Sequence, residues 1–285
     1  MNSLVPQECF QARPYITMVS AQGSAPLSEL CLDRLTSDQQ RALEQDLVLA
    51  AHVQRGLLPC TDVRLNDWCV HYQYKSEGIV SGDYCDVIPP VGQDGHLMFL
   101  LGDVSGKGVA ASLLMTHLHA TFRSLAGIDL DLDHLLEIAN RIFCESTMAS
   151  LYATLVCGRV GANGEIEIAS AGHLPAFHVS RAGVKEIGAT GLPLGLFPSS
   201  RYSVHHLRLE PGDTLLLYTD GISEARDTGG NEFGIDGLSL AVAGLHGFTA
   251  EELVTVCRES ADRFSSGVRQ ADDQTLMAIH FEGAR

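Results

Sequence analysis

Short apolar runs separated by turn sequences dominate the chain from about residue 68 onward, and this pattern predicts β-strands. Ala-Asn-Gly at 162–164 and Pro-Gly-Asp at 211–213 are two of the predicted turns. Because many strands joined by hairpin-like turns favour antiparallel pairing, we expect antiparallel sheets. The predicted strands cover residues 68–74, 84–88, 96–104, 152–160, 165–169, 176–179, 202–209, 213–219 and 275–279.

A helix is predicted ahead of the strands, over residues 37–58. Ser37 and Gln40 have the spacing of a capping box, and Pro59 stops the helix. Apolar residues recur as in a coiled-coil seam, which the polar Gln54 interrupts. We expect this helix to be a regulatory element that docks a partner or a second copy, with simple packing on the domain edge as the alternative. The seam positions are Leu43, Leu47, Ala50, Gln54 and Leu57.

Three later helices decide the fold class. Apolar faces predict two helices over residues 114–125 and 132–143, and a third covers 250–264 with Thr249 as its cap. Helices that arrive in pairs, and not after every strand, argue against a doubly wound fold. The predicted fold class is α+β, an antiparallel two-sheet β-sandwich flanked by helix pairs. The expected divisions of the chain are a tail or short extension at 1–36, a regulatory or linker helix at 37–59 and one domain at 60–285.

The composition is that of a packed protein with an acidic surplus. The chain has 285 residues, is 45% hydrophobic and carries a formal net charge of −16. Nucleic-acid binding is therefore not expected, because it needs Lys and Arg to neutralise phosphates. The N-terminus lacks the features of a signal peptide, and no window reaches the ~18 uninterrupted apolar residues of a membrane span. Eight cysteines without a C-x-x-C pair favour free thiols and a cytoplasmic location.

Aspartates beside apolar runs carry the candidate chemistry. Asp83, Asp103 and Asp220 each have a neighbouring glycine, and Asp272 and Asp273 precede the last predicted strand. A single aspartate after a strand is usually a turn or a cap residue. Several carboxylates that converge on one point repel one another, however, and a divalent cation relieves that repulsion. The set together therefore predicts a Mg²⁺ or Mn²⁺ site.

Two other kinds of site are excluded. Gly102 to Lys107 looks like a phosphate loop, but only three residues separate its two glycines, where a P-loop has four. His117 and His119 are two apart on a predicted helix and so face different ways. No pair of histidines has H-x-x-x-H spacing with a glutamate. Neither a nucleotide-binding loop nor a zinc site is expected.

Taken in order, eight sequence blocks resemble the bacterial SpoIIE/RsbU-type branch of the metal-dependent, protein phosphatase 2C-like (PPM) family. The resemblance runs from about Leu47 to Ile279. It implies an antiparallel β-sandwich flanked by helix pairs, in agreement with the fold expected from the strand and helix pattern. The blocks are LAAHVQRGLLP, VSGDYCDV, LLGDVSGKGVAASLLM, YATLVCGRV, SAGHLPAFHV, GLPLGLF, LEPGDTLLLYTDGISEA and DDQTLMAI.

The resemblance also implies two Mn²⁺ or Mg²⁺ ions bound between the sheets. Asp103 would bridge both ions, and the backbone carbonyl of Val104 would be a further ligand. Asp273 ranks below Asp272 because relatives often have Asn there, and Asp86 is a candidate outer-shell group. The implied metal ligands, which are also the implied catalytic residues, are Asp83, Asp103, Asp220 and Asp272.

The activity implied by the resemblance is that of a protein serine/threonine phosphatase. Two cations ~3.5–4 Å apart lower the pKa of a shared water, and the resulting hydroxide attacks phosphorus in line. The implied substrate is a phosphorylated protein of the anti-anti-sigma (STAS) type in a partner-switching circuit. Ser81 replaces the glycine common in the first block. Ser105 stands where eukaryotic relatives have a histidine thought to protonate the leaving group, which leaves the general acid unidentified.

Two alternatives stay open. A two-metal nucleotidyl cyclase also uses aspartates at strand ends, although its sheet needs a βαβ rhythm that the β-rich stretch after Leu151 does not show. A catalytically inactive phosphatase fold that serves as a binding module is the second alternative. The retained aspartates argue against it, because loss of the metals should relax them.

Overall fold

The computed structural model describes residues 36–90, 96–128, 130–148 and 150–283. The chain divides into two compact units, Met1–Asp46 and Leu47–Arg285. The tail expected at 1–36 lies outside the described residues except for Thr36, and so do Cys9 and Cys31. Apart from the first turns of helix α1, the elements below belong to the second unit.

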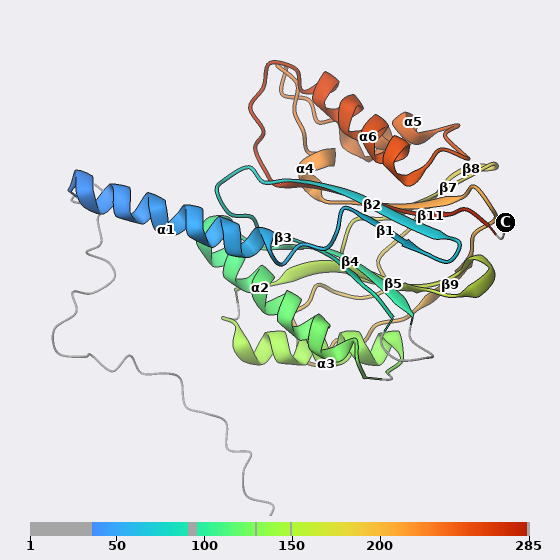
Figure 1. Ribbon diagram of the computed structural model, residues 1–285, viewed down its shortest axis with the longest axis horizontal. Helices are drawn as coiled ribbons and strands as arrows, with labels where there is room; N and C mark the ends of the chain where they lie inside the picture. The colour runs from blue at the N-terminus through green and yellow to red at the C-terminus, as the bar shows by residue number, and fades with distance from the viewer. Residues whose placement is uncertain (1–35, 91–95, 129, 149, 284–285) are drawn as a thin grey trace, which may run out of the picture. The chain divides into compact units, whose positions relative to one another are not determined.

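Two antiparallel sheets form the centre of the second unit (Figure 1), which confirms the predicted β-sandwich. The six-stranded sheet has the order β1 (Asp62–Leu65), β2 (Trp68–Lys75), β11 (Gln274–Phe281), β10 (Thr214–Tyr218), β7 (Ala176–Ser180) and β8 (Gly183–Ile187). The five-stranded sheet has the order β3 (Asp83–Ile88), β4 (Leu97–Val104), β5 (Ala153–Val160), β6 (Glu165–Ala171) and β9 (His205–Arg208).

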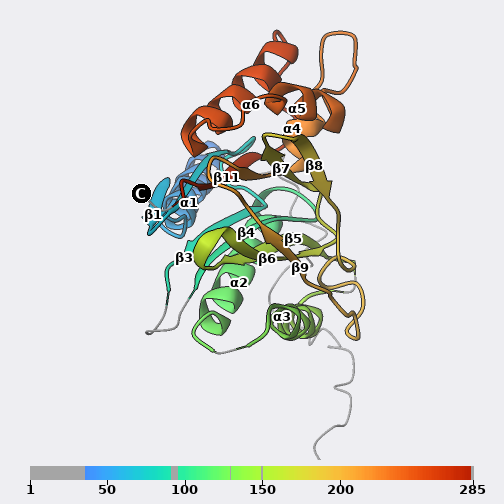
Figure 2. The same ribbon diagram turned by 90° about the vertical axis from the view of Figure 1, so that its right-hand side faces the viewer.

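Helices cover the outer faces of both sheets (Figure 2), as the predicted α+β class requires. The five-stranded sheet packs against α2 (Gly108–Leu125) and α3 (Leu132–Ser146). On the six-stranded sheet, α6 (Ala250–Phe264) packs against β2 and β11, with α4 (Asp220–Ser223) and α5 (Gly234–Val242) beside it. The remaining elements are α1 (Ser37–Arg55) and the short 3₁₀ helix η3 (Ala162–Gly164).

Side-chain alternation explains why each strand joins two cores. In β3, Cys85 and Val87 face the core between the sheets, whereas Tyr84 and Ile88 face the core under α2 and α3. Successive side chains of a strand point to opposite faces, so a strand buried on both sides is apolar along its whole length. This burial pattern holds the strand ends, where the aspartates lie, in a fixed frame.

Helix α1 begins where predicted, but its capping box is one residue earlier than expected. Gln39 N–H donates to Thr36 Oγ1 at 3.3 Å, and Thr36 N–H donates to Gln39 Oε1 at 2.9 Å. The predicted pair of Ser37 and Gln40 is wrong because Ser37 is already the first helical residue. The helix ends at Arg55, ahead of the predicted stop at Pro59.

The predicted seam of α1 is largely exposed, and the polar residue that interrupts it is the buried one. Gln54 is 7% exposed, whereas Leu43 is 42% exposed. Three other apolar side chains of this helix are also exposed, namely Val48, Leu49 and Val53. The helix therefore presents an unpartnered apolar surface within the described part of the chain.

Two expectations drawn from the composition can be compared with the structure. Of the helices that the structure describes, none has the length and apolar character needed to cross a membrane. The cysteines within the described ranges are free thiols, as predicted, and they are Cys60, Cys69, Cys85, Cys144, Cys157 and Cys257.

Candidate metal centre

The predicted aspartates come from both sheets, at strand ends that the pairing brings together. Asp83 opens β3 and Asp103 lies near the end of β4, and the two are direct partners in the strand register. Asp220 follows β10, and Asp272 precedes β11, which pairs with β10 antiparallel. Because the end of one antiparallel strand lies beside the start of the next, each pair of aspartates shares one end of its sheet.

Two threonines connect the two sheets at Asp83. Thr219 Oγ1 donates to Asp83 Oδ2 at 2.9 Å, and Thr275 Oγ1 donates to the same oxygen at 2.5 Å. Asp83 Oδ1, by contrast, is buried and has no hydrogen-bond partner. A buried carboxylate oxygen without a partner is costly. Asp83 therefore offers one oxygen, in a fixed direction, to a cation.

Glycines beside the aspartates allow close approach of the backbone. A Cβ atom added to Gly82 would lie 3.3 Å from the carbonyl oxygen of Val104 and 3.6 Å from Asp103 Oδ1. One added to Gly221 would overlap the carbonyl oxygen of Asp273. A side chain is therefore excluded at Gly221, while at Gly82 it would be a tight contact. The carbonyl of Val104 and the carboxylate of Asp103 thus line the same small space, which fits their predicted role as ligands of one metal centre.

Burial and mutual repulsion disfavour the ionised aspartates. Burial, followed by the charge of Asp103, raises the pKa of Asp83 well above its usual value. Burial and the charges of Asp220 and Asp272 raise the pKa of Asp103 to about 7. Burial and then the charge of Asp272 also raise the pKa of Asp220. Carboxylates in such surroundings gain from a bound divalent cation, which supplies the missing positive charge.

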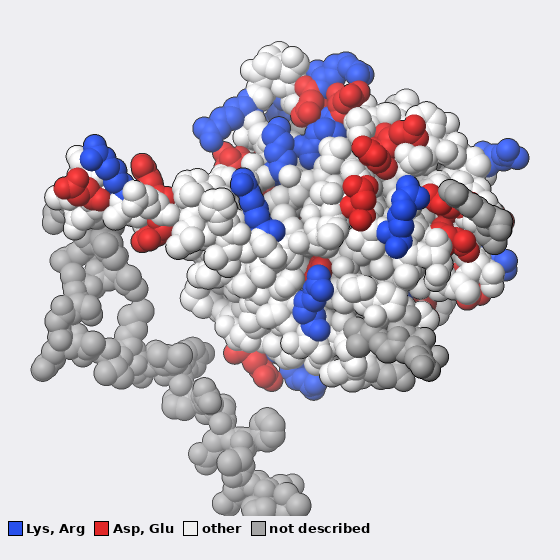
Figure 3. All heavy atoms as spheres, in the orientation of Figure 1, with Lys and Arg blue, Asp and Glu red and all other residues white. Residues whose placement is uncertain are grey.

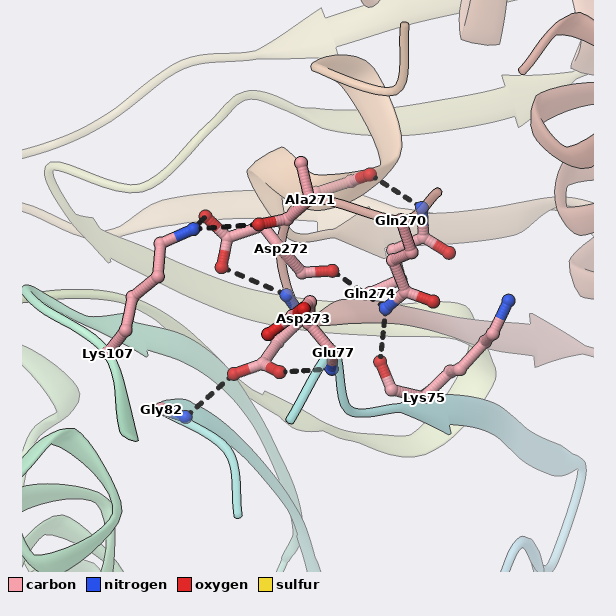
Figure 4. A network of polar contacts seen from close by, with 10 residues as sticks. Lys75, Glu77, Gly82, Lys107, Gln270, Ala271, Asp272, Asp273 and Gln274 are labelled. Atoms are coloured by element: carbon pink, nitrogen blue, oxygen red, sulfur yellow. Dashed lines mark hydrogen bonds and ion pairs between the residues drawn. The ribbon is translucent and has the colours of Figure 1, made fainter. Parts of the chain in front are cut away.

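Asp272 and Asp273 have different partners (Figure 4). Asp273 accepts backbone N–H groups with both oxygens, from Glu77 at 2.7 Å and from Gly82 at 2.8 Å. Asp272 Oδ2 instead accepts from Lys107 Nζ at 2.7 Å, and that lysine side chain is 62% exposed. Asp273 therefore anchors the loop before β3, while Asp272 holds a partner that can exchange with solvent or with a metal.

Asp86, predicted as an outer-shell group of the metal centre, is bonded to residues other than the proposed metal ligands. Its two oxygens accept the Arg123 guanidinium at 2.6 and 2.8 Å, and Tyr84 Oη donates to one of them at 3.2 Å. Asp86 is three residues from Asp83, which places the two side chains on opposite faces of β3. The carboxylate of Asp86 instead ties β3 to α2.

His173 is a residue of the site that the sequence patterns did not single out. Its Nε2 lies 3.0 Å from the carbonyl oxygen of Tyr218, so Nε2 carries the hydrogen, and Nδ1 accepts from Thr154 Oγ1 at 2.9 Å. Thr154 is the register partner of Asp103, and Tyr218 lies two residues before Asp220. Burial lowers the pKa of His173 to about 4. A neutral histidine therefore joins β5, the neighbour of the strand that carries Asp103, to β10, the strand that Asp220 follows.

The described residues contain one group of three metal-binding side chains with ligand atoms all within 4.8 Å of one another: Asp131, Asp133 and His134. This group lies at the start of α3 and is largely exposed. The predicted aspartates are spread more widely than that, as expected of carboxylates that repel one another.

Comparison with known proteins assigns the chain to a family. Residues 93–282 match the family described as Stage II sporulation protein E (SpoIIE). The chain belongs to the SpoIIE family. This membership confirms the resemblance to the SpoIIE/RsbU-type branch that the sequence blocks indicated.

Two relatives show how much of the SpoIIE-family chain is shared. Protein IcfG of Synechocystis sp. (strain ATCC 27184 / PCC 6803 / Kazusa) is 26% identical over 265 residues, covering 82% of this chain and 41% of IcfG. Phosphoserine phosphatase RsbU of Bacillus subtilis (strain 168) is 27% identical over 197 residues, covering 67% of this chain and 57% of RsbU. The chain thus spans about half the length of the curated relatives it matches.

A solved structure confirms the fold of this SpoIIE-family chain. The SiaA-PP2C domain of Pseudomonas aeruginosa matches with a TM-score of 0.70 at 18% identity, over 86% of this chain and 100% of that domain. The two chains therefore share the PP2C-like arrangement of two sheets between helix layers.

Proposed function

We propose that this chain is a metal-dependent protein serine/threonine phosphatase. The main support for the proposal is Asp83 Oδ1, which is buried without a hydrogen-bond partner and lies near aspartates from both sheets. Membership of the SpoIIE family and the similarity to RsbU, a phosphoserine phosphatase by name, support the reaction. The residues proposed to hold two Mn²⁺ or Mg²⁺ ions are Asp83, Asp103, Asp220, Asp272 and, through its carbonyl, Val104.

The chain's own residues prepare this site for a phosphoryl group. When bound, the divalent cations would lower the pKa of a water and neutralise phosphoryl oxygens. Thr219 and Thr275 keep Asp83 Oδ2 occupied, so that only Oδ1 is free for a metal. Lys107 brings a positive charge to the exposed side of the centre, where a phosphate must enter. At the position of the eukaryotic histidine, Ser105 Oγ accepts the N–H of Tyr152 at 2.9 Å.

The substrate we propose is a phosphoserine or phosphothreonine on an anti-anti-sigma (STAS) protein. Chelator-treated protein should release no phosphate from a phosphorylated STAS protein, and Mn²⁺ should restore the release. ATP at equal concentration should be hydrolysed more slowly. Full turnover in excess chelator would remove the metal mechanism, and faster turnover of ATP would favour the cyclase alternative. Metal binding without any turnover would favour the inactive binding module.

We also propose that α1 passes a signal to the metal centre. Gln54 Nε2 donates to the carbonyl of Ser81 at 2.7 Å, and Ser81 N–H donates to Gln54 Oε1 at 3.0 Å. Ser81 Oγ in turn accepts the N–H of Asp83 at 3.1 Å. A shift of the last turn of α1 would therefore act on a proposed metal ligand through two residues. The exposed apolar side chains of α1 suit an upstream regulator or a second copy of the chain.

A further inference from the structure

A cleft of about 450 Å³ opens beside the proposed metal centre. One end is formed by Asp272 and by Gly221, the neighbour of Asp220. Its walls come from the end of β2, the segment after α4 and the segment between α6 and β11. The cleft is lined by four cationic side chains, which are Lys75, Lys107, Arg226 and Arg269.

Four cationic side chains grouped in one cleft are unusual on a chain with a net charge of −16. Three carboxylates also line the cleft, those of Glu224, Asp262 and Asp272, so four cationic side chains face three anionic ones there. In Figure 3, blue side chains gather at the upper left, near the segment that precedes β11, whereas both charges are mixed over the rest of the drawn face. The cleft lining therefore carries one more cationic than anionic side chain, whereas the chain as a whole has a large acidic surplus.

The cationic groups are available to a ligand. Arg269 pairs with Glu77 at 2.8 Å and Arg226 pairs with Glu232 at 2.5 Å, and both arginine side chains are more than half exposed. Exposed ion pairs of this kind contribute little stability, so their partners exchange at low cost. Within the described ranges, the ammonium group of Lys75 makes no hydrogen bond or ion pair.

The wall of the cleft is fixed to the sheet. Gln270 Nε2 donates to the carbonyl of Lys75 at 3.0 Å and to the carbonyl of Asp272 at 2.7 Å (Figure 4). Lys107 Nζ adds a bond to the carbonyl of Ala271 at 2.8 Å. The segment before β11 is thereby tied both to β2 and to the start of α2. The backbone of this wall is therefore held in place, while the exposed side chains of Arg226 and Arg269 can exchange their partners.

We infer that this cleft binds the segment that flanks the phosphorylated residue of the substrate protein, and that it selects segments with carboxylates there. The inference rests on the proposed phosphatase function and specifies its substrate class. A phosphate held beside Lys107 at the proposed metal centre would place the residues next to it over the cleft, because Lys107 also lines the cleft and an extended chain advances ~3.3 Å per residue. Aspartates or glutamates at those positions find Lys75, Arg226 and Arg269 within the cleft.

Two synthetic phosphoserine peptides of equal length test the inference. One carries Asp and Glu beside the phosphoserine, and the other carries Asn and Gln at the same positions, so that only charge differs. With Mn²⁺ present, we expect kcat/KM to be about fivefold to tenfold higher for the acidic peptide, as two or three screened ion pairs allow. The preference should reside in KM and should shrink as the ionic strength rises to about 0.5 M.

Two variants test whether the arginines of the cleft cause the preference for the acidic peptide. An Arg226→Gln/Arg269→Gln double variant keeps much of each side chain and removes two charges, so the acidic preference should fall towards one. Arg208→Gln is the matched control, because Arg208 lies on β9 and does not line the cleft. Equal kcat/KM for the two peptides in the wild type would overturn the inference while leaving the phosphatase function intact. Absence of Mn²⁺-dependent turnover with either peptide would overturn both. A preference that survives in the double variant would place acidic recognition elsewhere.

Discussion

Asp103 is buried and is repelled by neighbouring carboxylates, and for this reason the stability of the metal-free protein should depend on pH. Its pKa is raised to about 7, first by burial and then by Asp220 and Asp272. A carboxyl whose pKa is higher in the folded state than in the unfolded state binds its proton more tightly when folded. The folded state therefore loses stability as the pH rises from about 4, the unfolded value, to about 7.

Asp103→Asn should consequently stabilise the metal-free protein. At pH 8 in chelator we expect a gain on the order of 1–2 kcal/mol in unfolding free energy, after allowance for solvent screening, and a smaller gain at pH 5. The same variant should lose Mn²⁺-dependent phosphatase activity. Thermal melting at both pH values and a phosphate-release assay check this, with Asp236→Asn on the surface of α5 as control. If Asp103→Asn keeps its phosphatase turnover, Asp103 is not a ligand of the catalytic metal ions.

His173 should act as a positioning residue for the centre. His173→Leu removes both ring hydrogen bonds and leaves the buried carbonyl of Tyr218 unpaired, which costs about 1–3 kcal/mol. His173→Gln can restore a donor and an acceptor and should lose less. We expect weaker Mn²⁺ binding in the leucine variant, with partial recovery in the glutamine variant, as measured by calorimetric titration beside denaturant unfolding. A loss of stability with unchanged Mn²⁺ affinity would reduce His173 to a packing role.

Contacts between distant residues explain what the sequence could not predict about this site. Asp83, Asp103 and Asp220 each have a local signature, an apolar run with a neighbouring glycine, whereas Asp272 was selected by its place before the last apolar run and by the family resemblance. Lys107 and Asp272, by contrast, are 165 residues apart and their ion pair has no local pattern. The two threonine hydroxyls on Asp83 come from positions 136 and 192 residues away. Such partners follow only from the pairing of the sheets.

Among the helices, α1 gives a direct test of coupling to the metal centre. Gln54→Leu removes both hydrogen bonds to Ser81, whose hydroxyl holds the N–H of Asp83. We expect Mn²⁺ affinity and kcat to fall severalfold while the domain stays folded, because only the last turn of α1 is released. Gln45→Leu is the matched control, since Gln45 lies on the same helix and is exposed. If Gln54→Leu and Gln45→Leu have equal Mn²⁺ affinity and equal kcat, α1 is not coupled to the metal centre.

The apolar surface of α1 makes a separate prediction about association. A Leu43→Asp/Leu47→Asp double variant places charges on the predicted seam and should weaken self-association or docking of a partner. If the helix regulates the domain, kcat should change together with association. Analytical ultracentrifugation and phosphate release on the same samples measure both. If the fold survives and neither quantity changes, α1 merely packs on the domain edge.

Element boundaries were predictable where the local signal is strong. Helix α6 begins after Thr249 as predicted, because Thr249 and Glu252 form a capping box that is visible in the sequence. The short strands β1 and β8 and helices α4 and α5 were not predicted. They contain four to nine residues, which is too few to establish a period against turn-like neighbours. The predicted strand at 202–209 shortens to β9 for lack of a longer partner, since β6 pairs only with His205–Arg208.

Over the whole molecule, the two sheets contribute equally to the proposed metal site. Asp83 and Asp103 belong to one sheet, while Asp220 and Asp272 flank the inner strands β10 and β11 of the other. Hydrogen bonds from Thr219 and Thr275 to Asp83 connect the sheets directly there. A metal ion bound between these aspartates would add a further connection. Binding of the metal and stability of the sandwich should then be linked.

We therefore expect Mn²⁺ to stabilise the protein by mass action. A ligand that binds only the folded state adds about 2.7 kcal/mol of unfolding free energy at 100 times its Kd. The melting temperature should rise steadily with Mn²⁺ concentration, and chelator should reverse the rise. Asp220→Asn should fold, melt at or above the wild-type value in chelator and respond little to Mn²⁺, because it loses a buried charge that the cations need. A wild-type melting temperature independent of Mn²⁺ would show that no cation joins the sheets, and an unaltered response in Asp220→Asn would remove that residue from the ligand set.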